Sequence, residues 1–287
     1  MNFAEMLHLE PDGPASWIGA PGLGVGKRMF GGHALAQALM AACLAEPGDK
    51  LPHSLHAGFL APGGADEPTT YRVSTLSEGR SFSKRRVDAF QGDRHILTMT
   101  VSAQVEETGF THALPPPDAV DVETALQQLE VWKGAQEQFD KLPVIGRLSK
   151  RPVEAVPLDV EGQFGSTARE AASACWMRSP MGETGDAAFA RCQLAYASDM
   201  LFLRNALLPH GVRPGEKGIQ IASLDHAIWF HGTPDFTRWN LYSGHSPWAG
   251  GARGLSLGHF FAEDGALIAT VAQENLMRLL DDRLEGC

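Results

Sequence analysis

The chain has 287 residues, of which 44% are hydrophobic, and it carries a formal net charge of −10. This length allows one or two domains with a sizeable core, and the acidic balance argues against general nucleic-acid binding. No stretch approaches the ~18 uninterrupted apolar residues of a membrane-spanning helix, and the acidic first residues are unlike a signal peptide. Four scattered cysteines without a C-x-x-C pair predict reduced thiols in a cytoplasmic protein, and neither a disulfide framework nor a zinc site.

The first third of the chain is typical of one helix followed by an antiparallel meander. The glycine-rich stretch 22–26 lacks the G-x-G-x-x-G spacing, so we expect short edge strands and a loop there rather than a dinucleotide site. Phe30-Gly31-Gly32-His33 opens a helix that ends near Ala45, and because this helix is apolar nearly all round, a sheet is expected to wrap around it. A turn at residues 91–93 and alternating patterns predict strands over 54–60, 70–76, 82–90 and 96–104.

The middle of the chain differs in composition from the two ends. Three successive prolines at 115–117 interrupt regular structure, and residues 123–142 have helical character with many polar positions. We expect a linker over 115–185 that carries one amphipathic helix on the outside and the first strand elements of a second unit.

The last third resembles the first. A strand is predicted over 189–197 and a helix over 200–208, and a hairpin turn is expected at 263–265. Further strands are predicted over 219–230, 237–243, 252–261 and 266–278.

Asp199 lies at the predicted junction between the strand and the helix. Backbone N–H groups at a helix N-terminus lack partners, so an acid there can act as a helix cap. It can also act as a general base on a water molecule if polar neighbours hold that water. These residues alone leave both roles open.

An internal repeat connects the two ends of the chain. Ser54 and Ser223 lie in similar segments, as do Gln104 and Gln273, and the members of each pair are 169 residues apart. The chain therefore reads as a fused duplication, with an N-terminal domain over 1–114, the linker over 115–185, and a C-terminal domain over 186–287. The same offset from Asp199 reaches Phe30, so only the second half carries the acid, which predicts a single active centre.

Other kinds of site are disfavoured by the sequence. No G-x-S-x-G motif is present, which argues against an α/β-hydrolase. His226 and His231 lie on a predicted strand without metal-ligand spacing, so no metal site and no cofactor are expected. Asp225 is the nearest rival to Asp199 as a base, and a structural hydrogen bond is the favoured role for it.

Several segments, in this order, resemble the acyl-CoA thioesterase II family of double-hotdog proteins. They cover nearly the whole chain except the linker, and they are Phe30-Gly31-Gly32, Arg80–Ser83 with Arg85–Val87, Leu194–Tyr196 with Asp199, Leu208–Gly211, Ser223–His226 with Trp229–His231, and Gln273-Glu274 with Met277-Arg278. The resemblance implies an α+β fold of two tandem hotdog repeats, each a helix wrapped by an antiparallel sheet. It also implies hydrolysis of fatty acyl-CoA to free acid and CoA, and a homodimer or homotetramer.

The catalytic trio of the family falls on Asp199, Ser223 and Gln273. The resemblance implies that Asp199 accepts a proton from water, while Ser223 and Gln273 hold that water. The N–H groups around Gly32 and His33 are candidates for stabilising the thioester oxygen, although the family often has Gln where this chain has His33.

Arginines on one predicted strand are candidates for contacting the phosphates of CoA. Arg85 and Arg86 adjoin Lys84, and strand alternation points neighbouring side chains to opposite faces. A solvated sheet face is an equally good explanation of these charges.

Two alternatives to the hydrolysis of fatty acyl-CoA stay open at this point. One is a non-catalytic acyl-CoA-binding or regulatory hotdog protein, and the other is a hotdog protein that acts on another acyl thioester. The presence of Asp199 favours the hydrolase. The sequence does not indicate the acyl chain length.

Overall fold

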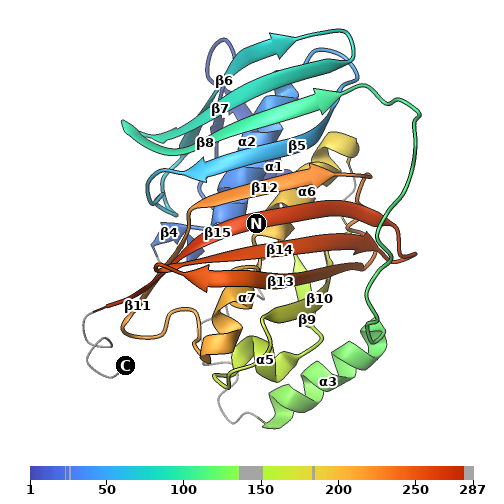
Figure 1. The fold of residues 1–287 in the computed structure, drawn as a ribbon. Coiled ribbons are helices and arrows are strands. Elements are labelled where there is room, and N and C mark those ends of the chain that lie inside the picture. Colours follow the sequence, from blue (N-terminus) through green and yellow to red (C-terminus); the bar gives the residue numbers. More distant parts are fainter. Residues whose placement is uncertain (23, 26, 136–150, 183–184, 281–287) are drawn as a thin grey trace.

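The structure is a computed structural model, which describes residues 1–22, 24–25, 27–135, 151–182 and 185–280. Among these residues, no helix combines the length and the apolar character needed to cross a membrane. The part of helix 123–142 that was expected beyond residue 135 lies outside the described residues. The fold is of the predicted α+β class, in which one large antiparallel sheet covers two central helices (Figure 1).

The large sheet contains 13 strands. Its order is β1 (Leu9–Pro11), β2 (Ser16–Gly19), β6 (Thr69–Glu78), β7 (Phe82–Gln91), β8 (Arg94–Gln104), β5 (Leu51–Phe59), β12 (Asp225–Phe230), β15 (Leu267–Leu279), β14 (Arg253–Ala262), β13 (Asn240–Gly250), β10 (Ala172–Arg178) and β9 (Glu154–Pro157). A short strand, β11 (Ile219–Ser223), pairs with β15 beside β12. The glycine-rich stretch contains the short strand β3 (Gly24–Val25), which pairs with β4 (Arg28–Met29) in a separate two-stranded sheet. A short strand was expected there, but at the edge of a larger sheet.

The two halves of the chain meet at the pair β5–β12. These strands run antiparallel, with Asp225 opposite Gly58 and Trp229 opposite Ser54. In Figure 1 the N-terminal and C-terminal strands therefore form one sheet that continues across this pair. Backbone hydrogen bonds between the halves remove two sheet edges that would otherwise be exposed.

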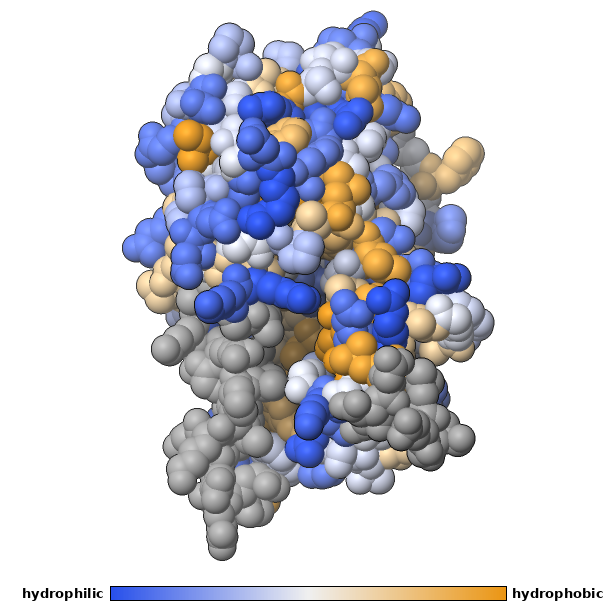
Figure 2. Space-filling model, turned by 90° about the vertical axis from the view of Figure 1, so that its left-hand side faces the viewer, coloured by the Kyte–Doolittle hydropathy of each residue, from blue (hydrophilic) through white to orange (hydrophobic). Residues whose placement is uncertain are grey.

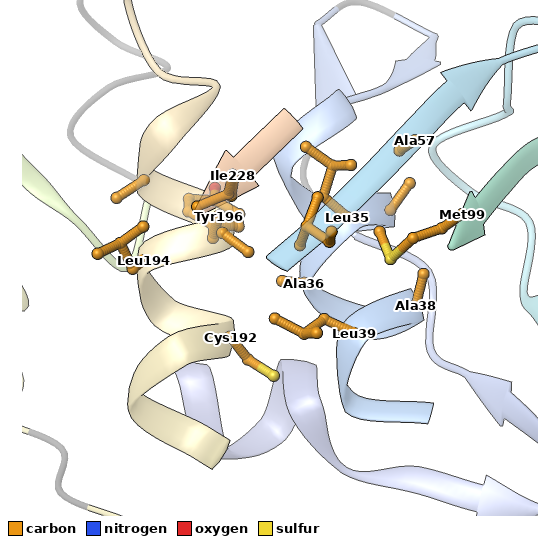
Figure 3. Close-up of a cluster of buried hydrophobic side chains, with 14 of the residues drawn as sticks. Leu35, Ala36, Ala38, Leu39, Ala57, Met99, Cys192, Leu194, Tyr196 and Ile228 are labelled. Carbon is orange, nitrogen blue, oxygen red and sulfur yellow. The ribbon is translucent and has the colours of Figure 1, made fainter. Parts of the chain in front are cut away.

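Two helices lie side by side against one face of the sheet, α2 (Gly31–Leu44) and α6 (Ala187–Ser198). Figure 3 shows Leu35 and Leu39 of α2 beside Cys192 and Tyr196 of α6. All four side chains are almost completely buried. Alanines line much of both helices and allow them to approach each other closely while keeping a high helix propensity.

The predicted strand over 189–197 is wrong, because these residues belong to helix α6. Asp186 begins the helix by accepting a hydrogen bond from the Phe189 N–H at 2.8 Å. The helix is buried on nearly every side, so its sequence shows no amphipathic period that would distinguish it from a buried strand. The predicted helix over 200–208 is confined to α7 (Arg204–Leu207), which is followed by the 3-10 turn η2 (Leu208–His210).

The linker region lies at the edge of the sheet that is formed by β13, β10 and β9. Helix α3 (Val122–Ala135) covers β9 and the short helix α5 (Val160–Phe164). A small separate core forms there from Ala125, Leu129, Val156, Val160 and Trp239. The amphipathic helix predicted for the linker is thus present and lies on the outside of the molecule (Figure 1).

The chain begins with a short helix, α1 (Phe3–Leu7), which packs on both central helices. Phe3 is fully buried, and its ring lies 5.4 Å from the ring of Tyr196 in an edge-to-face arrangement. The first residues therefore help to cover the contact between α2 and α6.

The long strand predicted over 219–230 is divided at Leu224. The N–H of Leu224 donates to the Glu274 carbonyl, and the Asp225 carboxylate accepts from the Glu274 N–H at 2.8 Å. Asp225 thus makes the structural hydrogen bond that the sequence favoured for it. The break places Ser223 at the end of β11, where it pairs with Asn275 of β15.

Candidate active site

Asp199 lies where the C-terminus of α6 meets the N-terminus of α2. It is the residue that ends α6, and its Oδ2 accepts a hydrogen bond from the Gly32 N–H at 2.8 Å. The residue before α2, Phe30, makes no capping hydrogen bond through its own side chain. Asp199 therefore caps a helix of the other half of the chain, instead of starting a helix that follows it as the sequence predicted.

Glycines allow this close approach of the two helix ends. A Cβ atom on Gly31 would lie 2.7 Å from Asp199 Oδ2, and one on Gly32 would lie 2.4 Å from the Tyr196 carbonyl oxygen. Such distances are too short for real atoms, so larger residues would push α2 and α6 apart. The close approach of the two helix ends thus requires glycine at both Gly31 and Gly32.

Ser223 and Gln273 come to the same place from two strands. The Gln273 Nε2 atom donates to Ser223 Oγ at 2.6 Å and to Asn275 Oδ1 at 2.8 Å. Gln273 and Ser223 also lie near the Asp199 carboxylate, and their polar side chains favour its ionised form. The structure therefore brings together the three residues that the family resemblance selected, and it adds Gly32 to them.

The surroundings of Asp199 change its acidity. Burial raises its pKa from 3.8 to about 6, while hydrogen bonds from Gly32, Gln273 and Ser223 and the charge of Arg151 oppose this rise. The side chain is still partly reached by solvent, although protein atoms surround it closely. A carboxylate of this kind is ionised at neutral pH and is a stronger base than an ordinary surface Asp.

Arg151 is a neighbour of the site that sequence reasoning missed. Its guanidinium carbon lies 4.0 Å from the centre of the Phe30 ring, and this ring packs edge-to-face against Tyr196 at 5.0 Å. Arg151 stands before Pro152 in the linker, and no motif in that region indicates it. The sequence could not have related this residue to a site formed by helix ends far along the chain.

His33 points away from Asp199, into a buried contact with the loop before β3. Its Nε2 lies 3.3 Å from the Ala20 carbonyl oxygen, and burial lowers its pKa to about 4. The backbone N–H of His33 donates to the Phe30 carbonyl, and that of Gly32 donates to Asp199. Both amides thus have acceptors, so this geometry does not support the expected contact of these two N–H groups with a thioester oxygen.

Arg85 and Arg86 are held by acidic residues of their own half. Arg85 is buried, and its guanidinium forms ion pairs with Glu46, at 3.1 Å, and with Glu78. Arg86 is exposed and pairs with Asp88 at 2.9 Å. The two side chains point to opposite sides of β7, as strand alternation predicted, and their contact with CoA stays a prediction.

No group of three or more His, Cys, Asp or Glu side chains suited to a metal ion occurs in the described parts of the chain. The side chains gathered around Asp199 supply a carboxylate, a hydroxyl and an amide. Together these groups can hold a water molecule through donors and acceptors and remove a proton from it.

Comparison with known proteins shows the family of the chain. A model described as acyl-CoA thioesterase N-terminal domain matches residues 20–104, and one described as acyl-CoA thioesterase matches residues 147–276. Acyl-CoA thioesterase 2 of Haemophilus influenzae is 39% identical over 261 residues, which cover 88% of each chain. Human acyl-coenzyme A thioesterase 8 is 34% identical over 291 residues, which cover 96% of this chain and 88% of the relative.

The fold agrees with these relationships. The crystal structure of acyl-CoA thioesterase II TesB2 from Mycobacterium marinum superposes with a TM-score of 0.80 at 30% identity, covering 98% of this chain and 99% of the other. This similarity confirms the prediction of a double hotdog. The chain belongs to the acyl-CoA thioesterase family and is a thioester hydrolase with a double-hotdog fold.

Proposed function

We propose that this protein hydrolyses fatty acyl-CoA to free fatty acid and CoA, with Asp199 as the general base and with Ser223 and Gln273 holding the attacking water. The observation that carries this proposal is the convergence of these three side chains at the junction of α2 and α6. The names of the relatives, all acyl-CoA thioesterases, support the substrate class.

The chemistry follows from the kinds of group at the site. Asp199 removes a proton from the water as the water oxygen attacks the carbonyl carbon of the thioester. Ser223 and the Gln273 amide hydrogen-bond to the water and keep it in line with that carbon. The C–S bond then breaks, and the proton taken up by Asp199 passes to the leaving CoA sulfur. The products are the free acid and CoA with its thiol restored.

Apolar groups are exposed on one face of the molecule. Figure 2 shows them as patches within a mainly hydrophilic surface. Burial of a fatty acyl chain against such groups contributes about 0.8 kcal/mol per CH₂ group. These exposed apolar groups are consistent with a substrate that has an apolar tail.

Release of free thiol from a panel of saturated acyl-CoAs of increasing chain length tests the proposal. We expect turnover of at least part of the panel at pH 8, with kcat/KM changing with chain length. Binding of acyl-CoA without any thiol release would contradict hydrolysis and would favour the acyl-CoA-binding alternative. Assembly as a homodimer or homotetramer and a cytoplasmic location stay predictions.

The activity is expected to decline in mildly acidic solution. Because the ionised form of Asp199 is the base and its pKa is raised to about 6, kcat/KM should be constant above pH 7 and fall about tenfold per pH unit below pH 5. Thiol release measured between pH 4.5 and 8.5, with the folded state checked by circular dichroism at each pH, gives the profile. Activity that stays constant down to pH 4.5 would contradict Asp199 as the base.

Arg151 is expected to affect this pH profile. Its positive charge lowers the pKa of Asp199, so Arg151→Ala should move the acidic limb of the profile to higher pH. Arg151→Lys is the matched control, because it keeps the charge and should leave the limb near its original position. If both variants retain the wild-type profile, the charge of Arg151 does not influence the base.

A further inference from the structure

His226 is a completely enclosed side chain behind the proposed site. It lies on β12, faces the helices, and is 1% exposed. Its Nδ1 is 2.7 Å from Gln273 Oε1, and its Nε2 is 2.8 Å from Ser198 Oγ. The imidazole thus connects Gln273 with the residue immediately before Asp199.

The protonation of this imidazole follows from its partners. Burial lowers the pKa of His226 to about 4, so the ring is neutral at pH 7 and carries one N–H. A carbonyl oxygen such as Gln273 Oε1 only accepts hydrogen bonds, so the proton belongs on Nδ1. Nε2 is then an acceptor. The single proton of the Ser198 hydroxyl, which also has the Ala195 carbonyl oxygen at 3.0 Å, is directed to the nearer Nε2 at 2.8 Å.

This assignment orients the amide of Gln273. With Oε1 held by His226, the Nε2 group faces Ser223 Oγ and Asn275 Oδ1 and donates to both. Ser223 Oγ therefore receives a hydrogen bond, and its own proton remains available for Asp199 or for the attacking water.

The alternative is a network in which the amides of Gln273 and Asn275 are both rotated by half a turn and the proton of His226 is on Nε2. Turning both amides would give an acceptor to the Asn275 Nδ2 atom, which is buried without a hydrogen-bond partner in the described structure. It would also leave the Ser198 hydroxyl free to donate to the Ala195 carbonyl oxygen at 3.0 Å. It would also turn the carbonyl oxygen of Gln273 toward Asp199, whose carboxylate gains from donors and is repelled by acceptors. We weigh the repulsion of an ionised carboxylate in a buried site above these two neutral hydrogen bonds, and this favours the first orientation.

We propose that His226 is a positioning residue, whose Nδ1–H fixes the amide of Gln273 so that its NH₂ group faces Ser223 and Asp199. The same network holds the end of α6, because the Tyr242 hydroxyl donates to the Ser198 carbonyl at 2.9 Å. His226 is enclosed, and its two ring nitrogens contact Gln273 and Ser198, so we infer that it acts through Gln273. The catalytic meaning of this role rests on the proposed function, although the orientation of the amide does not.

The tautomer of His226 can be measured directly. Nitrogen-15 NMR of histidine-labelled protein, with His226 assigned by comparison with His226→Asn, should show the proton on Nδ1, with no protonation of Nε2 down to about pH 5. A proton on Nε2 at pH 7 would overturn the proposal, since Gln273 would then present its carbonyl oxygen to the site. This measurement needs no substrate, so it stands even if hydrolysis is not observed.

Two substitutions separate positioning from packing. In His226→Asn the side-chain amide can place an N–H near the position of Nδ1, so kcat should stay within about threefold of wild type. His226→Leu removes the donor and leaves Gln273 Oε1 without its partner, so kcat should fall by about tenfold or more while KM changes by less than about twofold. Equal losses in both variants, or no loss in the leucine variant, would overturn the proposal.

Discussion

Asp199→Asn is expected to reduce kcat for acyl-CoA hydrolysis by about a thousandfold, because general-base catalysis contributes about 10²–10⁴ to a rate and an amide cannot accept the proton. The asparagine oxygen can still accept from the Gly32 N–H, so the contact between α2 and α6 should survive. Thiol release under saturating acyl-CoA, together with direct measurement of acyl-CoA binding, separates lost chemistry from lost affinity.

The same substitution should stabilise the protein at pH 8. Because burial raises the pKa of Asp199 from 3.8 to about 6, folding disfavours the ionised form, and native stability is lost as the pH rises from about 4 to 6. Neutral asparagine avoids this cost, so the free energy of unfolding at pH 8 should rise by on the order of 3 kcal/mol, with little difference at pH 4. Denaturant titrations at the two pH values provide the test.

Asp225→Asn is the matched control for the activity measurement. Asp225 is two residues from Ser223 and is the other acid considered as a base, but its carboxylate accepts a hydrogen bond from the Glu274 N–H. Asparagine keeps an acceptor there, so near wild-type turnover is expected. If Asp199→Asn were active and Asp225→Asn inactive, Asp225 would be the base instead.

Gly32→Ala is expected to lower kcat by about a hundredfold, although it alters no chemical group of the site. The added Cβ would lie 2.4 Å from the Tyr196 carbonyl oxygen and 2.5 Å from the Phe30 ring, so α2 and α6 must separate. The hydrogen bond from Gly32 to Asp199 would lengthen, and misplacement of a catalytic group by about 1 Å can cost 10²-fold in rate. Overpacking of this kind should also lower the free energy of unfolding by about 1–3 kcal/mol.

Gly109→Ala is the control for the effect of a glycine-to-alanine change in itself. Gly109 is exposed, and a Cβ there would meet no atom within 4 Å. Its kcat and its free energy of unfolding should both remain close to wild type. Full activity of Gly32→Ala would show that the helix ends can separate without moving Asp199 out of position.

The N-terminal half illustrates how far local patterns predict a fold. The meander of β5 to β8 was predicted with errors of only a few residues at the ends, because each strand alternates and tight turns separate the strands. Helix α2 was predicted equally well, since glycines mark its start and Pro47-Gly48 follow its end. The repeat also showed that only the second half carries an acid at the position of Asp199, which predicted a single active centre.

Helix α6 shows where local patterns fail. Its residues are apolar on almost every side, because the helix is buried between α2 and the sheet, so neither helical nor strand periodicity is visible. The position of Asp199 was therefore predicted at the start of a helix, whereas it ends one and caps another.

The sequence by itself determined the fold class, the two-fold repetition and the three polar residues of the candidate site, since composition, spacing and family motifs are properties of the chain. The tertiary structure alone decided what surrounds Asp199. Gly32 comes from another helix, Arg151 from the linker, and His226 acts on Gln273 across two strands. Hydrogen bonding and charge effects depend on distances between segments far apart in the chain, and those distances exist only after both halves have packed together.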